Sequence, residues 1–283
     1  MTKNKAEMIR TKLLEISARE NVSFQNIQTM FLLERMVAKL TSVKELFDSI
    51  VFKGGYVALR VFNSQRYTID LDALIKNGNE EKTVKKAITA IEKEQDDGVW
   101  FKFEKESDLM TLGEYGGTRL WFRCGIGLMP EKYYKAQSLH LDLATGDKVY
   151  PAPELNTMQN LFGEGIVSWK IYTVESAVAE KLHTLVVRGS DNSRSKDVFD
   201  LHTLLPQCSI PVLKEALKTT FAVRKDPLPE NFKETVSAID LLLLEKGWKS
   251  ATAGLISKMS IKEAFDTIIE YCGIIDEQIR NDL

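Results

Sequence analysis

The sequence has few cysteines and none of the marks of an exported or membrane-spanning chain. Cys124, Cys208 and Cys272 are odd in number, far apart and without a CxxC pair. That pattern argues against a disulfide framework and against a cysteine zinc site. The first residues are charged and polar rather than apolar, and no uninterrupted apolar run approaches membrane-spanning length. We therefore expect a cytoplasmic protein with reduced thiols and no membrane contact.

The chain also lacks a strong net charge of either sign. Its 38 lysines and arginines nearly balance 40 acidic residues, which leaves a formal charge of −2. This balance does not indicate wholesale binding to nucleic acid, so any contact with a polyanion must be a local patch. The 283 residues, 44% of them hydrophobic, are enough for one large domain or two modest ones.

Two aspartates one residue apart, Asp70 and Asp72, end a segment that is typical of a β-strand. Side chains at i and i+2 of a strand share a face, about 6–7 Å apart, so Ile69 and Leu71 would point into a core. Like charges at that distance raise each other's pKa unless a cation lies between them. Magnesium with substrate phosphates suits such a pair. The alternative is a pair of solvated aspartates at a strand end.

A glycine pair, Gly54-Gly55, precedes the aspartates and is followed by the helix-compatible segment 57–62. Glycine lets the backbone approach a ligand closely, and a turn that leads into a helix presents N–H donors to an anion. The pattern predicts a phosphate-binding turn beside the carboxylate strand. Phosphoryl chemistry is therefore the leading interpretation.

A second acidic strand is predicted around Asp142. Leu139, Leu141 and Leu143 alternate with polar residues, which places Asp142 and His140 on a polar face. If this strand lies beside the first, three carboxylates converge and can hold two metal ions ~3.5–4 Å apart. The alternative is an exposed aspartate on an edge strand.

The remaining pattern is mainly helical. Helices are predicted within residues 3–49, over 82–94 and over 174–188, with strands at 100–104 and 118–125. Thr173 is placed to cap the helix over 174–188.

Lys181 falls on the flank of the apolar stripe of this helix. Burying its ammonium is costly without an anion. It either reaches water along its stem or serves a triphosphate.

A basic loop tip, Arg194 and Lys196, follows this helix. Ser193 or Ser195 is expected to cap a further helix running to Pro206. On that helix Asp197 and Asp200 share one face at i, i+3.

Five short motifs in one order resemble the AbiEii/AbiGii nucleotidyltransferase toxins of the DNA polymerase β-type nucleotidyltransferase superfamily. The helical N- and C-terminal regions are similar too, so the resemblance covers nearly the whole chain. The motifs are Lys53-Gly54-Gly55, Arg66-x-Thr68-x-Asp70-Leu71-Asp72, Leu139-x-Leu141-Asp142, Ala179-Glu180-Lys181-Leu182-His183 and Asn192-Ser193-Arg194-x-Lys196-Asp197-x-x-Asp200-Leu201.

The resemblance implies an α+β fold, with a mixed sheet flanked by helices and a helical C-terminal region. It implies N-terminal helices over 1–49, a catalytic core over 50–165 and a helical region over 166–283 that completes the active site. Tyr56, where the superfamily favours serine, puts one hydroxyl contact to phosphate in doubt. Ala73 replaces a bulkier apolar residue, and the spacing from Gly55 to Asp70 is longer than in the shortest superfamily members.

The resemblance also implies the roles of individual residues. Magnesium or manganese would be held by three aspartates, and the triphosphate would be bound by the glycine turn and by basic residues. Lys181 and Asp197 would be catalytic with the three aspartates. The implied metal ligands are Asp70, Asp72 and Asp142, and the implied nucleotide-binding residues are Lys53, Gly54, Gly55, Lys181, Arg194 and Lys196.

The implied activity is transfer of a nucleotide from a nucleoside triphosphate to an acceptor hydroxyl, with the 3′ end of tRNA as the expected acceptor. The implied partner is an AbiEi-like antitoxin in a toxin–antitoxin or phage-defence pair. Three alternatives stay open. The chain could modify a small molecule or a protein, sense nucleotides without catalysis, or be a helical interaction protein whose Asp-x-Asp is incidental.

Overall fold

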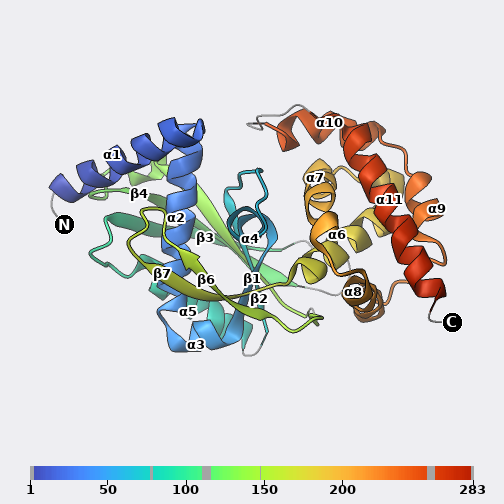
Figure 1. The fold of residues 1–283 in the computed structure, drawn as a ribbon. Coiled ribbons are helices and arrows are strands. Elements are labelled where there is room, and N and C mark those ends of the chain that lie inside the picture. The colour runs from blue at the N-terminus through green and yellow to red at the C-terminus, as the bar shows by residue number, and fades with distance from the viewer. Residues whose placement is uncertain (1–2, 77–78, 110–115, 147, 254–258, 282–283) are drawn as a thin grey trace. The chain divides into compact units, whose positions relative to one another are not determined.

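The fold is that of a computed structural model, which describes residues 3–76, 79–109, 116–146, 148–253 and 259–281. The chain divides into two compact units (Figure 1). Unit 1 comprises Met1–Tyr56, Tyr67–Gly146 and Leu155–Ile171, and unit 2 comprises Val57–Arg66, Asp147–Glu154 and Tyr172–Leu283. Within the described ranges, no helix combines the length and apolar composition that crossing a bilayer would need.

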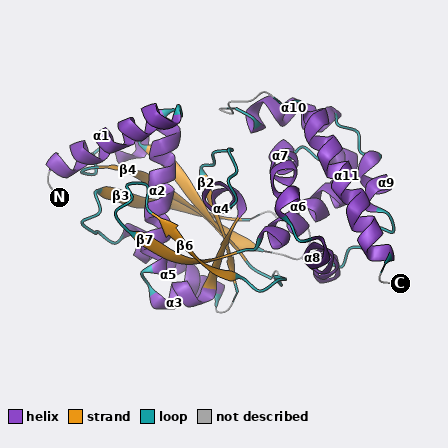
Figure 2. Cartoon of the chain, in the orientation of Figure 1, coloured by secondary structure: helices purple, strands orange, loops and turns teal. Residues whose placement is uncertain are grey.

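A mixed sheet forms the centre of unit 1 (Figure 2). It has seven strands in the order β3-β4-β5-β2-β1-β7-β6. Strand β2 runs antiparallel to β1 and parallel to β5, and β4 runs antiparallel to β5. The strands are β1 (Ile50–Lys53), β2 (Asp70–Ile75), β3 (Val99–Asp108), β4 (Gly117–Ile126), β5 (Gln137–Ala144), β6 (Glu154–Gln159) and β7 (Ile166–Ile171).

Four helices of unit 1 each contact a strand of this sheet. They are α1 (Lys3–Glu20), α2 (Phe24–Thr41), α3 (Lys44–Ser49) and α5 (Glu80–Glu92). The core of the sheet comes from alternating residues such as Leu71, Leu139 and Leu141, which are fully buried. Because strand side chains alternate, the aspartates between these leucines lie on the other face.

Helix α4 (Gly54–Val61) starts at the glycine pair, immediately after β1. The chain therefore passes from strand to helix with no intervening loop, as the glycine turn predicts. Gly54–Tyr56 belong to unit 1, whereas the rest of this helix is assigned to unit 2.

Unit 2 is helical and has its own apolar core (Figure 2). Side chains such as Leu182, Leu201 and Leu217 are fully buried there. Its helices are α6 (Val174–Arg188), α7 (Ser195–Leu204), α8 (Ile210–Val223), α9 (Phe232–Ser237), α10 (Leu242–Ala251) and α11 (Ile261–Arg280).

The predicted α+β class is confirmed, and so are the helix over 174–188 and its cap, because Thr173 accepts a hydrogen bond from the Ser176 amide. Three details were wrong. The aspartates begin β2 rather than end a strand, and Ile69 is 53% exposed rather than in the core. Arg194, not a serine, is the N-cap residue of α7, with no side-chain cap. The three cysteines are unpaired, as expected.

Candidate active site

One face of the sheet in unit 1 collects the predicted carboxylates. The parallel pairing of β2 with β5 places Asp72 opposite Asp142 and Asp70 opposite His140. These four side chains therefore share a face of two neighbouring strands. The sequence predicts that the carboxylates converge if the two acidic strands lie side by side, and the two strands do so. An incidental Asp-x-Asp motif would lie far from Asp142. The pairing of β2 with β5 excludes that arrangement.

One hydrogen bond and one close histidine contact hold the first aspartate at the start of β2. The Asp70 amide donates to Thr68 Oγ1 at 3.2 Å. His140 Nε2 lies 2.7 Å from Asp70 Oδ1, and its ring packs against Trp121 at a tilt of 40°, with centroids 4.7 Å apart. The His140 side chain is nearly buried, whereas Asp70 keeps about a third of its side chain exposed, at 7% and 31%. The histidine therefore orients a carboxylate that solvent can still reach.

Gly54 lies against the second aspartate. Its φ is +75°, a conformation that side chains rarely adopt, and a Cβ built on it would lie 2.0 Å from Asp72 Oδ2. Glycine is therefore required twice, for the backbone conformation and for the close approach. The first turn of α4, whose amides have no helical partners, begins beside a metal-type carboxylate. An anion bound to that turn would lie next to Asp72.

The other two residues of the glycine motif take different positions. Lys53 ends β1, opposite Asp72 in the antiparallel register, and is half-buried. Gly55 is the second residue of α4 and is buried. Register thus brings a lysine, a glycine turn and two aspartates to one edge of β1 and β2.

Asp142 is held by an arginine that the sequence did not single out. Arg119 on β4 lies directly opposite Asp142 and binds it through Nε at 2.7 Å and Nη2 at 2.6 Å. The hydrogen bond to Asp142 raises the pKa of Arg119 above its ordinary value against the opposing effect of burial, and the charges of Asp70 and Asp72 add to the rise. The polar alternation of residues 118–125 marks this strand, but only the pairing with β5 reveals the partner.

We tested the fit of a divalent cation on the donor set and the glycine turn. Asp70 and Asp72 offer hard oxygen donors on one face, and magnesium in nucleotide sites is bound by one or two carboxylates plus substrate phosphates. Gly54 leaves room for a phosphate beside Asp72 where a Cβ would collide. Among the described residues, no three His, Cys, Asp or Glu side chains are arranged to hold a metal ion. The residues fit a two-carboxylate site completed by substrate oxygens.

The predicted residues of unit 2 form a separate buried network. Lys181 Nζ lies 2.7 Å from Asp197 Oδ1 and 2.8 Å from Asp200 Oδ2. Arg66 binds both oxygens of Asp200, through Nε at 2.9 Å and Nη2 at 2.8 Å. Sequence reasoning named Asp200 only as a neighbour of Asp197 and gave Arg66 no role. Arg66 lies four residues before β2 and Asp200 lies in the middle of α7, and neither position carries a local signal for pairing.

Opposite charges outweigh burial throughout this network. Burial lowers the pKa of Lys181, but Asp197 and Asp200 raise it to about 12. Burial raises the pKa of Asp200, but Lys181 and Arg66 lower it to about 2. The pKa of Asp197 is also below its ordinary value, because Lys181 and Arg194 overcome the effect of burial. All members are therefore ionised at neutral pH, which answers how the chain tolerates a buried Lys181.

The basic tip of the same unit is only partly engaged. Arg194 Nε lies 2.5 Å from Asp197 Oδ2, and its side chain is 55% exposed. Lys196 is exposed at the start of α7. The contacts of Arg194 place it on the rim of the buried network, where one end of its guanidinium faces solvent.

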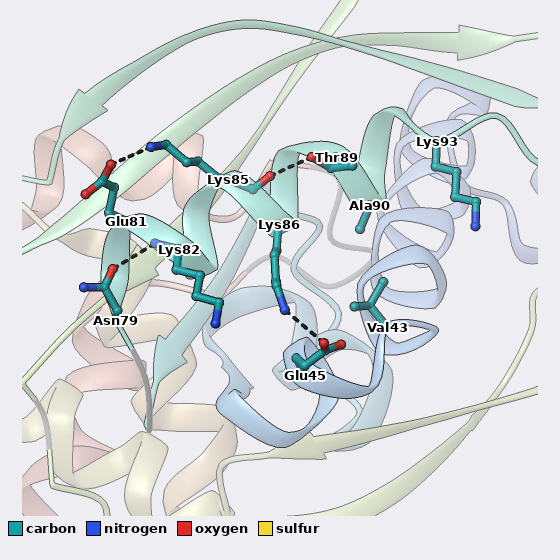
Figure 3. A pocket seen from close by; sticks show the side chains of 10 residues that line it. All are labelled: Val43, Glu45, Asn79, Glu81, Lys82, Lys85, Lys86, Thr89, Ala90 and Lys93. Carbon is teal, nitrogen blue, oxygen red and sulfur yellow. Dashed lines mark hydrogen bonds and ion pairs between the residues drawn. The ribbon is translucent and has the colours of Figure 1, made fainter.

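A groove elsewhere in unit 1 is lined by residues from α3, α5 and their flanks (Figure 3). Two of its lysines are neutralised, because Lys85 pairs with Glu81 and Lys86 pairs with Glu45. No predicted site residue lines it. The groove is therefore distinct from the carboxylate face.

The chain matches the sequence profile of the family described as nucleotidyl transferase AbiEii toxin, type IV toxin–antitoxin system, over residues 35–271. No curated protein matches it. The chain is similar to the crystal structure of JHP933 from Helicobacter pylori at 16% identity and a TM-score of 0.55, over 92% of this chain and 96% of the other. It is also similar to a candidate nucleotidyltransferase from H. pylori at 15% identity and a TM-score of 0.50, over 93% and 99%.

The fold is that of a nucleotidyltransferase, and the family match covers most of the sequence. The chain belongs to the AbiEii nucleotidyltransferase toxin family. The sequence resemblance is thereby confirmed at the level of family, fold and enzyme class.

Proposed function

We propose that this toxin transfers a nucleotide from a nucleoside triphosphate to the 3′-terminal hydroxyl of tRNA in a magnesium-dependent reaction. The close approach of Gly54 to Asp72 carries the proposal. It supports a site where the phosphates of a nucleotide and a cation bound to Asp70 and Asp72 are neighbours. The family supports the enzyme class, and the acceptor is our inference from the resemblance.

The chemistry is a displacement at phosphorus. The acceptor oxygen bonds to the α-phosphorus, the bond from that phosphorus to the pyrophosphate oxygen breaks, and the hydroxyl proton leaves to water. Magnesium, when bound, neutralises the charge of the phosphates and of the departing pyrophosphate. Asp70 and Asp72 would hold the cation, with Asp70 oriented by His140, and the α4 turn beginning at Gly54-Gly55 would donate N–H groups to the phosphates.

The basic residues are assigned by their positions. Lys53, opposite Asp72, is placed to bind phosphate from the neighbouring strand. Contacts of Lys181, Arg194 and Lys196 with the triphosphate, and a catalytic role for Asp197, stay predictions from the family resemblance. The ion pairs of Lys181, Arg194 and Asp197 within unit 2 support a structural role for these three residues.

The family supports an antitoxin partner and a toxin–antitoxin setting. We propose an AbiEi-like antitoxin and a cytoplasmic site of action, where tRNA and nucleoside triphosphates are available. Manganese would be an acceptable replacement for magnesium, because carboxylate and phosphate oxygens suit both ions.

The test is a labelling assay with each of the four α-labelled nucleoside triphosphates, magnesium and bulk tRNA. We expect label on tRNA with at least one nucleotide, and a loss of about 100-fold or more in Asp72→Asn, because a ligand to the cation is removed. Asp108→Asn is the matched control, since Asp108 is exposed on β3 of the same sheet. Its labelling should equal that of the wild type.

The alternatives predict other outcomes of the same assay. Label on the protein or on a small molecule, and none on tRNA, would indicate the same fold acting on a different acceptor. No label from any nucleotide on any acceptor, with nucleotide binding intact, would favour a non-catalytic sensor. Either result would contradict the proposed acceptor.

A further inference from the structure

Arg119 and Asp142 form a closed ion pair on the carboxylate face. Both donors of one edge of the guanidinium reach both oxygens of the carboxylate, at 2.7 and 2.6 Å. The Asp142 side chain is 12% exposed and that of Arg119 33%. Two parallel hydrogen bonds of this kind are among the strongest that proteins form. Asp142 is thus already bound at both oxygens by a group of the chain itself.

The backbone holds this pair in place. Arg119 on β4 and Asp142 on β5 are direct partners in the antiparallel register, where opposite side chains lie within about 5.5 Å at Cβ. The guanidinium also lies 5.7 Å from the centre of the Trp121 ring, a distance at which a cation is attracted to the ring face. An arginine stays charged at any pH at which the protein is folded. Asp142 therefore stays paired, because the strand register holds Arg119 opposite it and Arg119 does not lose its charge.

The pair has no net charge, unlike the aspartate alone. A second divalent ion ligated by Asp142 would have to expel the guanidinium or lie next to its positive charge, which Coulomb repulsion opposes. Asp70 and Asp72 lie on the neighbouring strand, where Lys53 of β1 is opposite Asp72 and His140 of β5 is opposite Asp70. The guanidinium therefore opposes the binding of a second ion at Asp142.

We propose that Arg119 takes the place of a second metal ion, so that the protein binds a single divalent ion per nucleotide, held by Asp70 and Asp72. This rests on the proposed function, and it departs from the three-aspartate metal set implied by the family resemblance. Asp142 then acts as a positioning residue, which fixes the guanidinium beside the phosphates. Arg119 supplies there a positive charge that needs no ion from solution.

The test is a count of bound manganese by electron paramagnetic resonance, on the full chain with a saturating α,β-methylene triphosphate. We expect one Mn²⁺ per complex for the wild type. Arg119→Gln frees Asp142 and should bind two, and the double variant Arg119→Gln/Asp142→Asn should return to one. Arg119→Lys keeps the charge and should stay at one. A merely structural arginine would not change the count.

Two results would overturn the proposal. One is two Mn²⁺ ions in the wild-type complex, a count that does not depend on any variant folding. The other is an unchanged count in Arg119→Gln whose thermal unfolding matches the wild type. The proposed function fails differently, because then neither nucleotide nor Mn²⁺ binds to the wild type, and the Arg119 proposal falls with it.

Discussion

The two units of this chain treat charge in different ways. In unit 1, Asp70 and Asp72 lie on a half-exposed sheet face. Gly54 has no side chain, so its backbone lies directly against Asp72. In unit 2, Asp197, Asp200, Lys181 and Arg66 are buried and satisfy one another. Both clusters come from short sequence motifs, and the sequence alone assigns a catalytic or binding role to each.

We interpret this difference as one between a proposed ligand site in unit 1 and a charge network in unit 2 whose members neutralise one another. Buried charges are tolerated only when paired, and removing one partner leaves the other uncompensated. The carboxylates of unit 1 keep access to solvent and to a helix start, as binding a cation and phosphates requires. Substitutions in unit 2 should therefore act first on stability, and those in unit 1 on binding and catalysis.

The largest expected effect is in the buried network. Asp200→Ala leaves both Arg66 and Lys181 without a shared anion and should lower the free energy of unfolding by about 3–5 kcal/mol. Urea denaturation measures it. Asp266→Ala, on an exposed position of α11 in the same unit, is the control and should leave stability unchanged. Equal stability of the two variants would remove the distinction between the units.

The next effect is on activity. Gly54→Ala places a methyl group where Asp72 Oδ2 now lies, so nucleotide transfer should fall about 100-fold, the cost of a displacement of roughly 1 Å at a reacting site. Gly163→Ala is the control, because its φ is +73° and the nearest atom to a built Cβ is 3.7 Å away. It carries the same backbone strain without the collision. Equal losses of nucleotide transfer in both variants would mean that backbone strain, not the collision with Asp72, causes the loss.

A smaller effect concerns acid. Lys181 and Arg66 depress the pKa of Asp200 from its ordinary value of 3.8 to about 2, so its contribution is complete above pH 4 and is lost as the pH falls towards 2. The shift corresponds to about 2 kcal/mol. The stability difference between wild type and Asp200→Asn should narrow by that amount over this range, as measured by urea denaturation. A stability difference that stays constant over this pH range would show that the pairing does not lower the pKa of Asp200.

The smallest effect is at an exposed ion pair. Lys85 and Glu81 are four residues apart on α5, with most of both side chains in solvent (Figure 3). Pairs of this kind contribute little to stability. Lys85→Ala should leave the unfolding midpoint and nucleotide transfer unchanged, and a clear loss of transfer would give the α5 groove a functional role.

Much of the site could be predicted because its signals are local. The glycine pair before a helix, the i, i+2 aspartates and the leucine alternation around Asp142 each depend on a few consecutive residues. The boundary of β2 was misplaced, because Arg66–Ile69 has the apolar and β-branched residues of a strand. Thr68 binds the Asp70 amide instead, so the chain turns before the strand begins.

The rest depends on which segments meet in three dimensions. The pairing of β4 with β5 brings Arg119 to Asp142. The sequence of neither strand indicates which strand it pairs with. The same holds for Arg66 and Asp200, which lie 134 positions apart. Lys181 could be recognised as an unusual buried lysine, but the anions that neutralise it came only with the structure.

The central claim is that the cation and the nucleotide bind at the Gly54–Asp72 face of unit 1. Iron(II) in place of magnesium, with ascorbate and peroxide, cleaves the backbone close to its site, and mass spectrometry maps the cuts. We predict nucleotide-dependent cuts near Gly54 and near Asp70–Asp72, absent in Asp72→Asn. Cuts confined to the segment from Lys181 to Asp200 would contradict the account.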